Sequence, residues 1–135
     1  MTQALTYDSI QVGRTLGPVV HELTPEYVRD YRVATGADAP VAAGVGSVAP
    51  GTMTTIFSTA LLGDAGVNRP SGGIHAKQQY RYLAPLRVGS RVTTTGRVIE
   101  KFIRNGRKTV VYEALTVDEQ GRELARCTAT SIVPL

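Results

Sequence analysis

The C-terminal half of the chain alternates between apolar and polar residues over four stretches. These stretches are Ile74–Leu83, Arg91–Ile103, Lys108–Val117 and Arg122–Val133. Alternation with a period of two is typical of β-strands that bury one face. Asn105-Gly106, between the second and third stretches, is the strongest hairpin signal in the chain. We therefore expect four consecutive antiparallel strands.

The N-terminal part predicts one short strand and one helix. The strand is expected at Gly17–Leu23, and the helix begins directly after it, at Thr24-Pro25. Thr is a favoured N-cap residue, and Pro is favoured at the first helical position. The helix should end at Gly36. The following segment, up to Ala49, is Gly-rich and small, with Asp38 as its single ionisable residue, and it predicts a loop.

A second and more apolar helix is expected from Pro50-Gly51-Thr52 to Gly63. Its apolar residues follow the spacing of one buried stripe: Met53, Ile56, Phe57, Ala60 and Leu61. The other face consists of Ser and Thr, so we expect it to be covered on most sides. A meander of long strands has to bury one face, and this helix can fill it. The fold class is therefore α+β, with an antiparallel five-stranded sheet wrapped around a central helix.

Composition narrows the class of protein further. The 135 residues fit one domain, and the net charge of +4 comes from 15 Lys+Arg against 11 Asp+Glu. The cations alternate with apolar residues instead of forming a basic face with stacking aromatics, which argues against nucleic-acid binding. No apolar run has the ~18 residues of a membrane span, and the N-terminus does not resemble a signal peptide. We expect a cytoplasmic protein. Metal-ligand spacing and nucleotide motifs are absent, so neither a metal nor an organic cofactor is expected.

The segment from His75 to Gly89 resembles the signature strand of MaoC-like dehydratases, above all those related to the dehydratase domain of type I fatty acid synthase. It has a His, then Gln78, the aromatic residues Tyr80 and Tyr82, and Pro-Leu before a Gly. The segment Ala49–Met53 resembles the start of that family's central helix. The resemblance implies one hot-dog domain over residues 1–135. It also implies a ligand that is an acyl thioester of coenzyme A or of an acyl carrier protein.

The family's hydratase motif, Gly-Asp-any-Asn-Pro-aliphatic-His, is altered in this chain. Alignment on Gly36 and Pro40 places Ala37 at the motif's Asp and Ala42 at its His, while Asp38 lies one residue late. The resemblance implies that some family members without this pair act as the non-catalytic half of a heterodimer. The other interpretation is a rearranged acid/base set within this chain.

Elimination of water from a 3-hydroxyacyl thioester needs a base, an acid and a group that stabilises the thioester oxygen. Asp38 and His75 are the catalytic candidates, although Asp38 can equally bond the turn backbone and His75 can be a half-buried strand histidine. Pro50, Gly51 and Thr52 offer a helix N-terminus that either binds the oxygen or only starts the helix. Gln78 and Tyr80 are expected mainly to pack in the sheet, with the polar end of one of these side chains reaching the substrate.

Three functions remain open at this stage. The first is an (R)-specific enoyl-thioester hydratase or 3-hydroxyacyl-thioester dehydratase. The second is a non-catalytic acyl-binding subunit of a heteromeric dehydratase, and the third is a hot-dog thioesterase. We expect a homodimer, or a heterodimer with a second hot-dog subunit, because the small polar helix face needs cover. Arg residues near the strand ends are expected to meet the phosphates of coenzyme A.

Overall fold

A computed structural model describes residues 6–37, 44–63 and 72–134. The elements follow in the order β1 (Thr15–Glu22), α1 (Pro25–Ala34), β2 (Val48–Ala49), a 3₁₀ turn (Gly51–Met53), α2 (Thr54–Gly63), β3 (Ile74–Tyr82), β4 (Leu86–Arg87), β5 (Arg91–Arg104), β6 (Arg107–Val117) and β7 (Glu123–Val133). The predicted order of a strand, a helix, a more apolar helix and four strands is confirmed, although α1 and α2 both have 10 residues.

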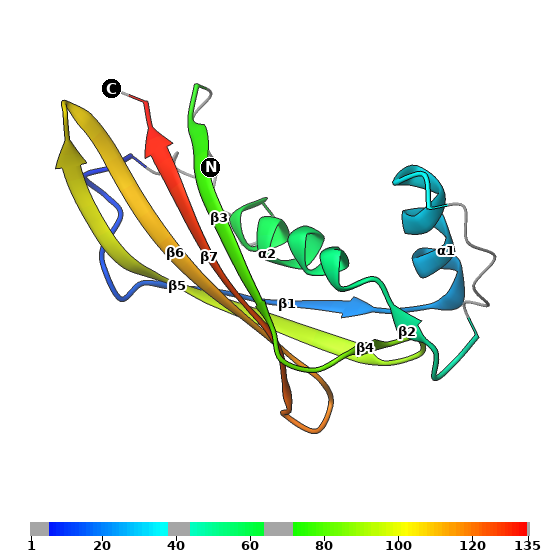
Figure 1. Ribbon diagram of the computed structural model, residues 1–135. Helices are drawn as coiled ribbons and strands as arrows, with labels where there is room; N and C mark the ends of the chain where they lie inside the picture. Colours follow the sequence, from blue (N-terminus) through cyan, green and yellow to red (C-terminus); the bar gives the residue numbers. More distant parts are fainter. Residues whose placement is uncertain (1–5, 38–43, 64–71, 135) are drawn as a thin grey trace.

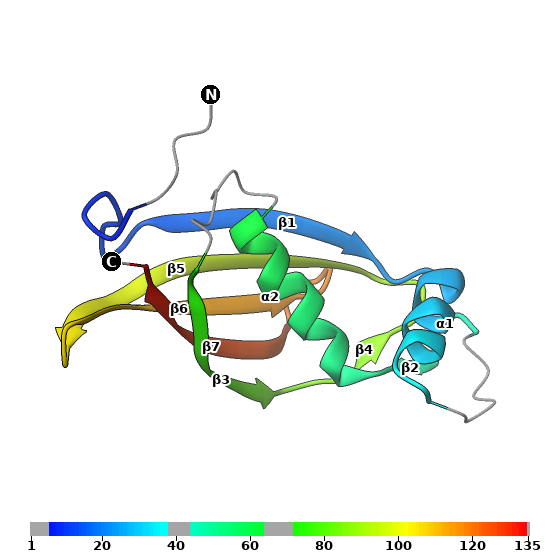
Figure 2. The same cartoon turned by 90° about the horizontal axis from the view of Figure 1, so that it is seen from above.

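Five strands form one antiparallel sheet in the order β1-β5-β6-β7-β3. The sheet is strongly curved, and α2 lies across its concave face (Figure 1). Seen from above, α2 runs diagonally over the strands between the two edges of the sheet, β1 and β3 (Figure 2). This is the predicted α+β hot-dog arrangement, in which the sheet wraps around one central helix.

The apolar stripe of α2 and of the turn before it packs on the sheet. Met53 and Phe57 are completely buried, and Leu61 is nearly so. The opposite face is only partly covered, since Thr55 and Thr59 are exposed. The prediction that this small polar face is covered on most sides is therefore not met within a single copy of the chain.

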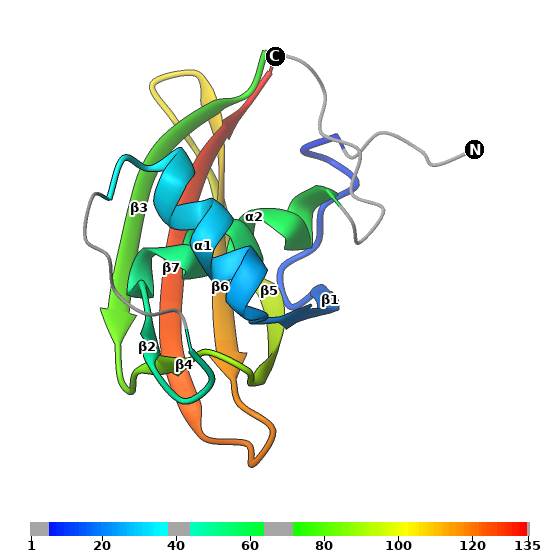
Figure 3. The ribbon, with the colours of Figure 1, turned by 90° about the vertical axis from the view of Figure 1, so that its right-hand side faces the viewer.

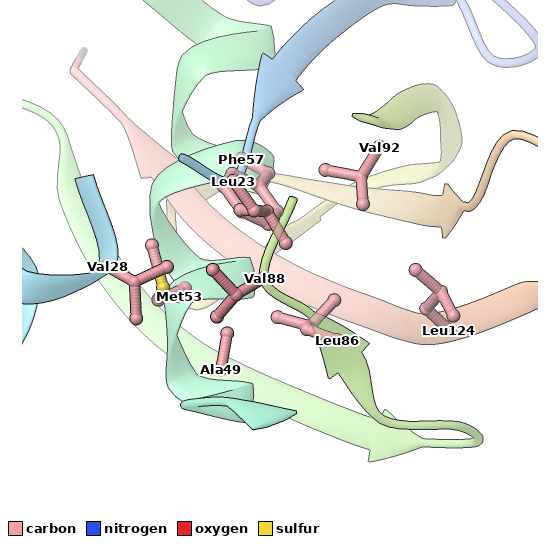
Figure 4. Close-up of a cluster of buried hydrophobic side chains, with 9 residues drawn as sticks. All are labelled: Leu23, Val28, Ala49, Met53, Phe57, Leu86, Val88, Val92 and Leu124. Carbon is pink, nitrogen blue, oxygen red and sulfur yellow. The ribbon is translucent and has the colours of Figure 1, made fainter. Parts of the chain in front are cut away.

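A second group of buried side chains closes one end of the molecule. Helix α1 and the short pair β2–β4 lie at that end, beside the start of α2 (Figure 3). Side chains from all of these elements meet in one cluster (Figure 4): Leu23, Val28, Ala49, Met53, Phe57, Leu86, Val88, Val92 and Leu124. The cluster packs the start of α2 against α1 and the β2–β4 pair.

Some boundaries differ from the sequence predictions. The pair β2–β4 was not predicted, because two-residue strands carry no periodic signal. The first strand begins at Thr15, two residues earlier than expected, and Gly17 lies inside it at a bulge with φ +83°. A glycine inside a strand often marks such a bulge instead of an end. The second helix begins with a 3₁₀ turn before α2.

Candidate active site

A cavity of about 260 Å³ lies between α2 and the concave face of the sheet. Its apolar lining includes Leu16, Leu61, Ala114 and Ala129, which come from β1, α2, β6 and β7. Its polar lining includes Ser58, Thr59, His75 and Gln78. A mostly apolar cavity with a few convergent polar groups is the usual form of a small-molecule site.

The polar side of the cavity is a hydrogen-bonded group that joins α2 to β3. The Gln78 side-chain amide donates to the Tyr80 hydroxyl, and this hydroxyl lies 3.1 Å from Ser58 Oγ. Burial raises the pKa of Tyr80 above its usual value, and the hydrogen bond between Tyr80 and Ser58 opposes that shift. Tyr80 therefore remains a neutral phenol near neutral pH and can donate a proton to a hydrogen bond.

Cys127 lies beneath this group on β7. It is buried, and Gln78 Nε2 approaches its sulfur at 3.6 Å. Residues Tyr80 and Cys127 are paired across the β3–β7 register, which places both side chains on the concave face. Cys127 is thus a small buried residue that also lines the cavity.

The helix N-terminus proposed to bind the thioester oxygen is at the opposite end of α2 from Leu61. Pro50 caps the 3₁₀ turn by accepting a hydrogen bond from Met53 N–H, 3.1 Å, and Gly51 and Thr52 open the turn. A Cβ atom at Gly51 would lie 3.3 Å from the ring of Tyr82, so a larger residue would require this exposed ring to shift by a few tenths of an ångström. The hydroxyl of Tyr31 donates to Thr52 Oγ1 at 2.6 Å. Two tyrosines thus surround this turn.

His75 lies far from that turn within one copy of the chain. Strand β3 and helix α2 run in opposite directions (Figure 2), so the end of β3 meets the start of α2. Tyr82, which packs on Gly51, is seven residues beyond His75 along the strand, a span of about 20 Å. The exposed His75 instead lines the cavity near the second half of α2. The structure does not bring His75 and Gly51 together in one subunit.

The other catalytic candidate, Asp38, lies outside the described residues, as does Ala42. Ala37, at the position of the motif's Asp, is exposed at the end of the turn after α1. Sequence reasoning did not identify Ser58 as part of the site. The Ser and Thr residues on one face of α2 indicated that this face could contribute hydroxyl groups to a site. The sequence alone could not show which of them faces Tyr80.

Within the described ranges, no group of three or more His, Cys, Asp and Glu residues is arranged to hold a metal ion. No helix in those same ranges is both long and apolar enough to cross a membrane.

Comparison with known proteins agrees with the fold. The R-hydratase PhaJ1 from Pseudomonas aeruginosa superimposes with a TM-score of 0.78 at 17% identity, covering 95% of this chain and 84% of that one. The (R)-hydratase from A. caviae, involved in PHA biosynthesis, gives 0.74 at 16% identity, with 93% and 98% covered. The HadBC (3R-hydroxyacyl-ACP dehydratase) complex from Mycobacterium tuberculosis gives 0.75 at 21% identity, with 90% and 96% covered.

The class defined by this fold is that of the hot-dog proteins, and the chain shares it with the MaoC-like dehydratase from Rhodospirillum rubrum, with a TM-score of 0.75 at 19% identity. No curated protein matches the chain in sequence. The model of the FAS1-like dehydratase domain region, however, matches residues 10–127. The chain therefore belongs to the FAS1-like dehydratase domain family, and the resemblance of the segment from His75 to Gly89 is confirmed.

Proposed function

We propose that this protein is an (R)-specific enoyl-thioester hydratase or 3-hydroxyacyl-thioester dehydratase acting on an acyl thioester of coenzyme A or of an acyl carrier protein. The observation that carries the proposal is the cavity beneath α2, which combines an apolar lining with hydrogen-bonding groups in a chain of the dehydratase family. An apolar cavity suits an acyl chain, and the N-terminal turn at Gly51 lies at the start of the same helix.

The turn at Gly51-Thr52 is the proposed site for the thioester oxygen. The first N–H groups of a helix have no acceptor within the helix, and they point out of its N-terminus. They stabilise negative charge that develops on a carbonyl oxygen during proton abstraction at the neighbouring carbon. Gly51 permits close approach because it has no Cβ. The ring of Tyr82 covers one side of the turn and reduces contact with water.

Asp38 and His75 are the proposed acid and base. Because His75 of the same copy lies about 20 Å along β3 from Tyr82, the proposal requires His75 from a second copy. β3 is an edge strand of the sheet. Two copies of β3 can therefore pair antiparallel about a two-fold axis, so that each contact between two different residues occurs twice. A pairing centred between Gln78 and Gln79 would place His75 of one copy opposite Tyr82 of the other. The active site would then be shared between two copies.

The hydratase activity of the purified chain alone tests this function. Crotonyl-CoA and longer enoyl-CoAs are incubated with the protein, and loss of the conjugated thioester absorbance is followed. Asp38→Asn and His75→Ala should each lower turnover by a factor of ~10² or more, the usual scale for a general acid or base. Wild-type turnover in the double variant would refute the acid/base assignment. An equal mixture of the two single variants should regain part of the activity if each site takes its two groups from different copies.

A second function is favoured by one specific observation. Ala37 and Ala42 occupy the positions of the family's catalytic pair, so the chain could bind the acyl group while a partner hot-dog subunit supplies the chemistry. HadBC and the ChsH1–ChsH2 complex, both from Mycobacterium tuberculosis, are complexes of related fold. Hydration that begins only when such a partner is added would establish this function in place of the first.

A further inference from the structure

A second hollow, of about 490 Å³, lies on the convex face of the sheet, beside the turn between β5 and β6. Its floor includes one row of side chains across three strands, because Phe102 pairs with Thr109 and Thr109 pairs with Ile132. Thr109 and Ala114 are five positions apart on β6, so their side chains point to opposite faces. Ala114 packs with Leu61 of α2. The hollow is therefore separated by the sheet from α2, which lies across the concave face (Figure 1).

Two arginines, Arg104 and Arg107, stand at the rim of this hollow. They pair directly across the β5–β6 register, next to the turn. Like charges directly opposite each other destabilise a strand pair. Neither arginine forms an ion pair with any of the described residues, whereas Arg97 and Arg126 on the same face both reach Glu113. The rim therefore holds two positive charges that no described carboxylate neutralises.

The floor beneath these arginines is apolar and lies ready for a ligand. Phe102 and Ile132 are half-buried and leave part of their surface open. The guanidinium carbon of Arg104 lies 5.1 Å from the centroid of the Phe102 ring, and this cation–π contact holds the charge beside the apolar floor. The hollow has the size of small-molecule pockets, about 300–1,000 Å³, which combine an apolar lining with a few polar groups.

We propose that this hollow binds a phosphate monoester that carries an apolar or aromatic body. Guanidinium groups form paired hydrogen bonds with phosphate oxygens, and a monoester carries a charge of about −1.5 to −2 near neutral pH. This charge matches two arginines, whereas a carboxylate supplies a single negative charge. The body of the ligand lies on Phe102 and Ile132. Because the sheet separates the hollow from the cavity beneath α2, the proposal does not rest on the hydratase function.

Two sources of this chemistry are an alkyl phosphate and the adenosine 3′-phosphate end of coenzyme A. The wild-type protein is titrated at constant ionic strength with hexyl phosphate, adenosine 3′-phosphate, inorganic phosphate, hexanoate and hexanol, and its amide resonances are followed by NMR. At least one monoester should bind about fivefold more tightly than inorganic phosphate and hexanoate, a factor that burial of one or two methylene groups supplies. The shifts should centre on the β5–β6 turn, and the tighter monoester identifies the source.

Arg104→Gln and Arg107→Gln should each weaken binding of that monoester by about tenfold or more, because each removes a charge-assisted hydrogen bond. Both positions are exposed, so the fold should be kept. Arg81→Gln is the matched control, since it removes an exposed arginine of β3 that does not line the hollow, and it should bind like the wild type. Phe102→Ala should abolish the preference over inorganic phosphate and leave the binding of inorganic phosphate itself unchanged.

Unchanged affinity in both arginine variants would overturn the proposal, as would failure of both monoesters to bind. Hexanol or hexanoate binding as tightly as the monoesters would also overturn it, because the two charges would then not select the ligand. Shifts centred on Ser58 and Gln78 would place the ligand in the cavity beneath α2 and would equally contradict it. Each of these results leaves the hydratase function standing.

Discussion

Tyr80 shows how one residue serves both packing and the site. Its ring stacks on Tyr82 with the centroids 5.9 Å apart, while its hydroxyl bonds Ser58 on α2. The ring and the hydroxyl together hold the edge strand against the central helix. Sequence alternation places Tyr80 on a strand, but its partner Ser58 is 22 residues away along the chain.

Removing this hydroxyl should destabilise the protein in a pH-dependent way. Tyr80→Phe should lower the free energy of unfolding by about 1 kcal/mol at neutral pH, because Ser58 and Gln78 lose a partner. Burial raises the pKa of Tyr80 above the ordinary phenol value of 10.0. The unfolded phenol ionises first, so this stabilisation is complete below pH 10 and is lost as the pH rises through the folded-state pKa.

The gap in stability between the wild type and Tyr80→Phe should therefore narrow above pH 10, as measured by urea unfolding across a pH series. Tyr82→Phe is the control, since it deletes the hydroxyl of an exposed tyrosine on the same strand. A gap that stays constant or widens at alkaline pH would contradict the argument.

Gly96 fixes how closely α2 approaches the sheet. A Cβ atom there would lie 2.8 Å from Leu61 Cδ1 and 3.0 Å from the carbonyl oxygen of Glu113. Gly96→Ala should cost roughly 1–3 kcal/mol of stability, the usual effect of overpacking. Thermal unfolding measures the loss. Gly44→Ala, where a Cβ would meet no atom within 4 Å, is the control.

The double variant Gly96→Ala/Leu61→Ala should be less destabilised than the sum of its single changes, because the smaller side chain removes one of the two contacts. Additive losses would show that the contact with Leu61 is not the cause.

At the level of elements, the β5–β6 hairpin was the most predictable feature. Asn105 and Gly106 both adopt positive φ values, 50° and 73°, as a two-residue type I′ turn requires. The turn sets the register next to it, where Arg104 pairs with Arg107, and a register shift between Val98 and Glu100 moves the pairing by one residue, so that Thr93 pairs with Val117. The remaining strands are aligned through these two.

Asn105→Ala should lower the free energy of unfolding by about 1 kcal/mol, because the left-handed backbone conformation is less favourable for alanine than for asparagine or glycine. Asn105→Gly should be close to neutral. Chemical denaturation of the three proteins measures the order. An alanine variant as stable as the wild type would show that the turn does not constrain this register.

At the scale of the whole molecule, edge strand β3 is the least covered element. Apart from Gln78 and Tyr80, its residues are exposed, including Ile74 at 56% and Tyr82 at 52%. The exposed Thr55 and Thr59 lie on α2 near the same edge. An exposed strand edge with apolar side chains favours pairing with another strand. This arrangement supports the proposed second hot-dog copy along β3.

Ile74→Glu should weaken that dimer, because each copy would bury an unpaired charge at one end of the paired β3 strands. Ile103→Glu is the matched control, since Ile103 is similarly exposed, at 60%, but lies at the end of β5, away from this edge. Sedimentation of both variants at micromolar concentration should show dissociation only for Ile74→Glu. A monomeric wild type would contradict the dimer, and dissociation of both variants would show that the interface lies elsewhere.

The sequence by itself determined the elements and the family. Periodicity identified the long strands and the apolar stripe of α2, since both signals are local and repeat along the chain. The spacing of His75, Gln78, Tyr80 and Tyr82 indicated the dehydratase family, which the match over residues 10–127 confirmed.

Only the tertiary structure decided which of the candidate residues meet. Because α2 and β3 run in opposite directions, Tyr82 packs on Gly51 while His75 lines the cavity beside the second half of α2. The same antiparallel packing brings the Ser58 hydroxyl within 3.1 Å of the Tyr80 hydroxyl. Contacts between residues far apart in sequence depend on how helix and sheet pack, and local patterns carry no record of that packing.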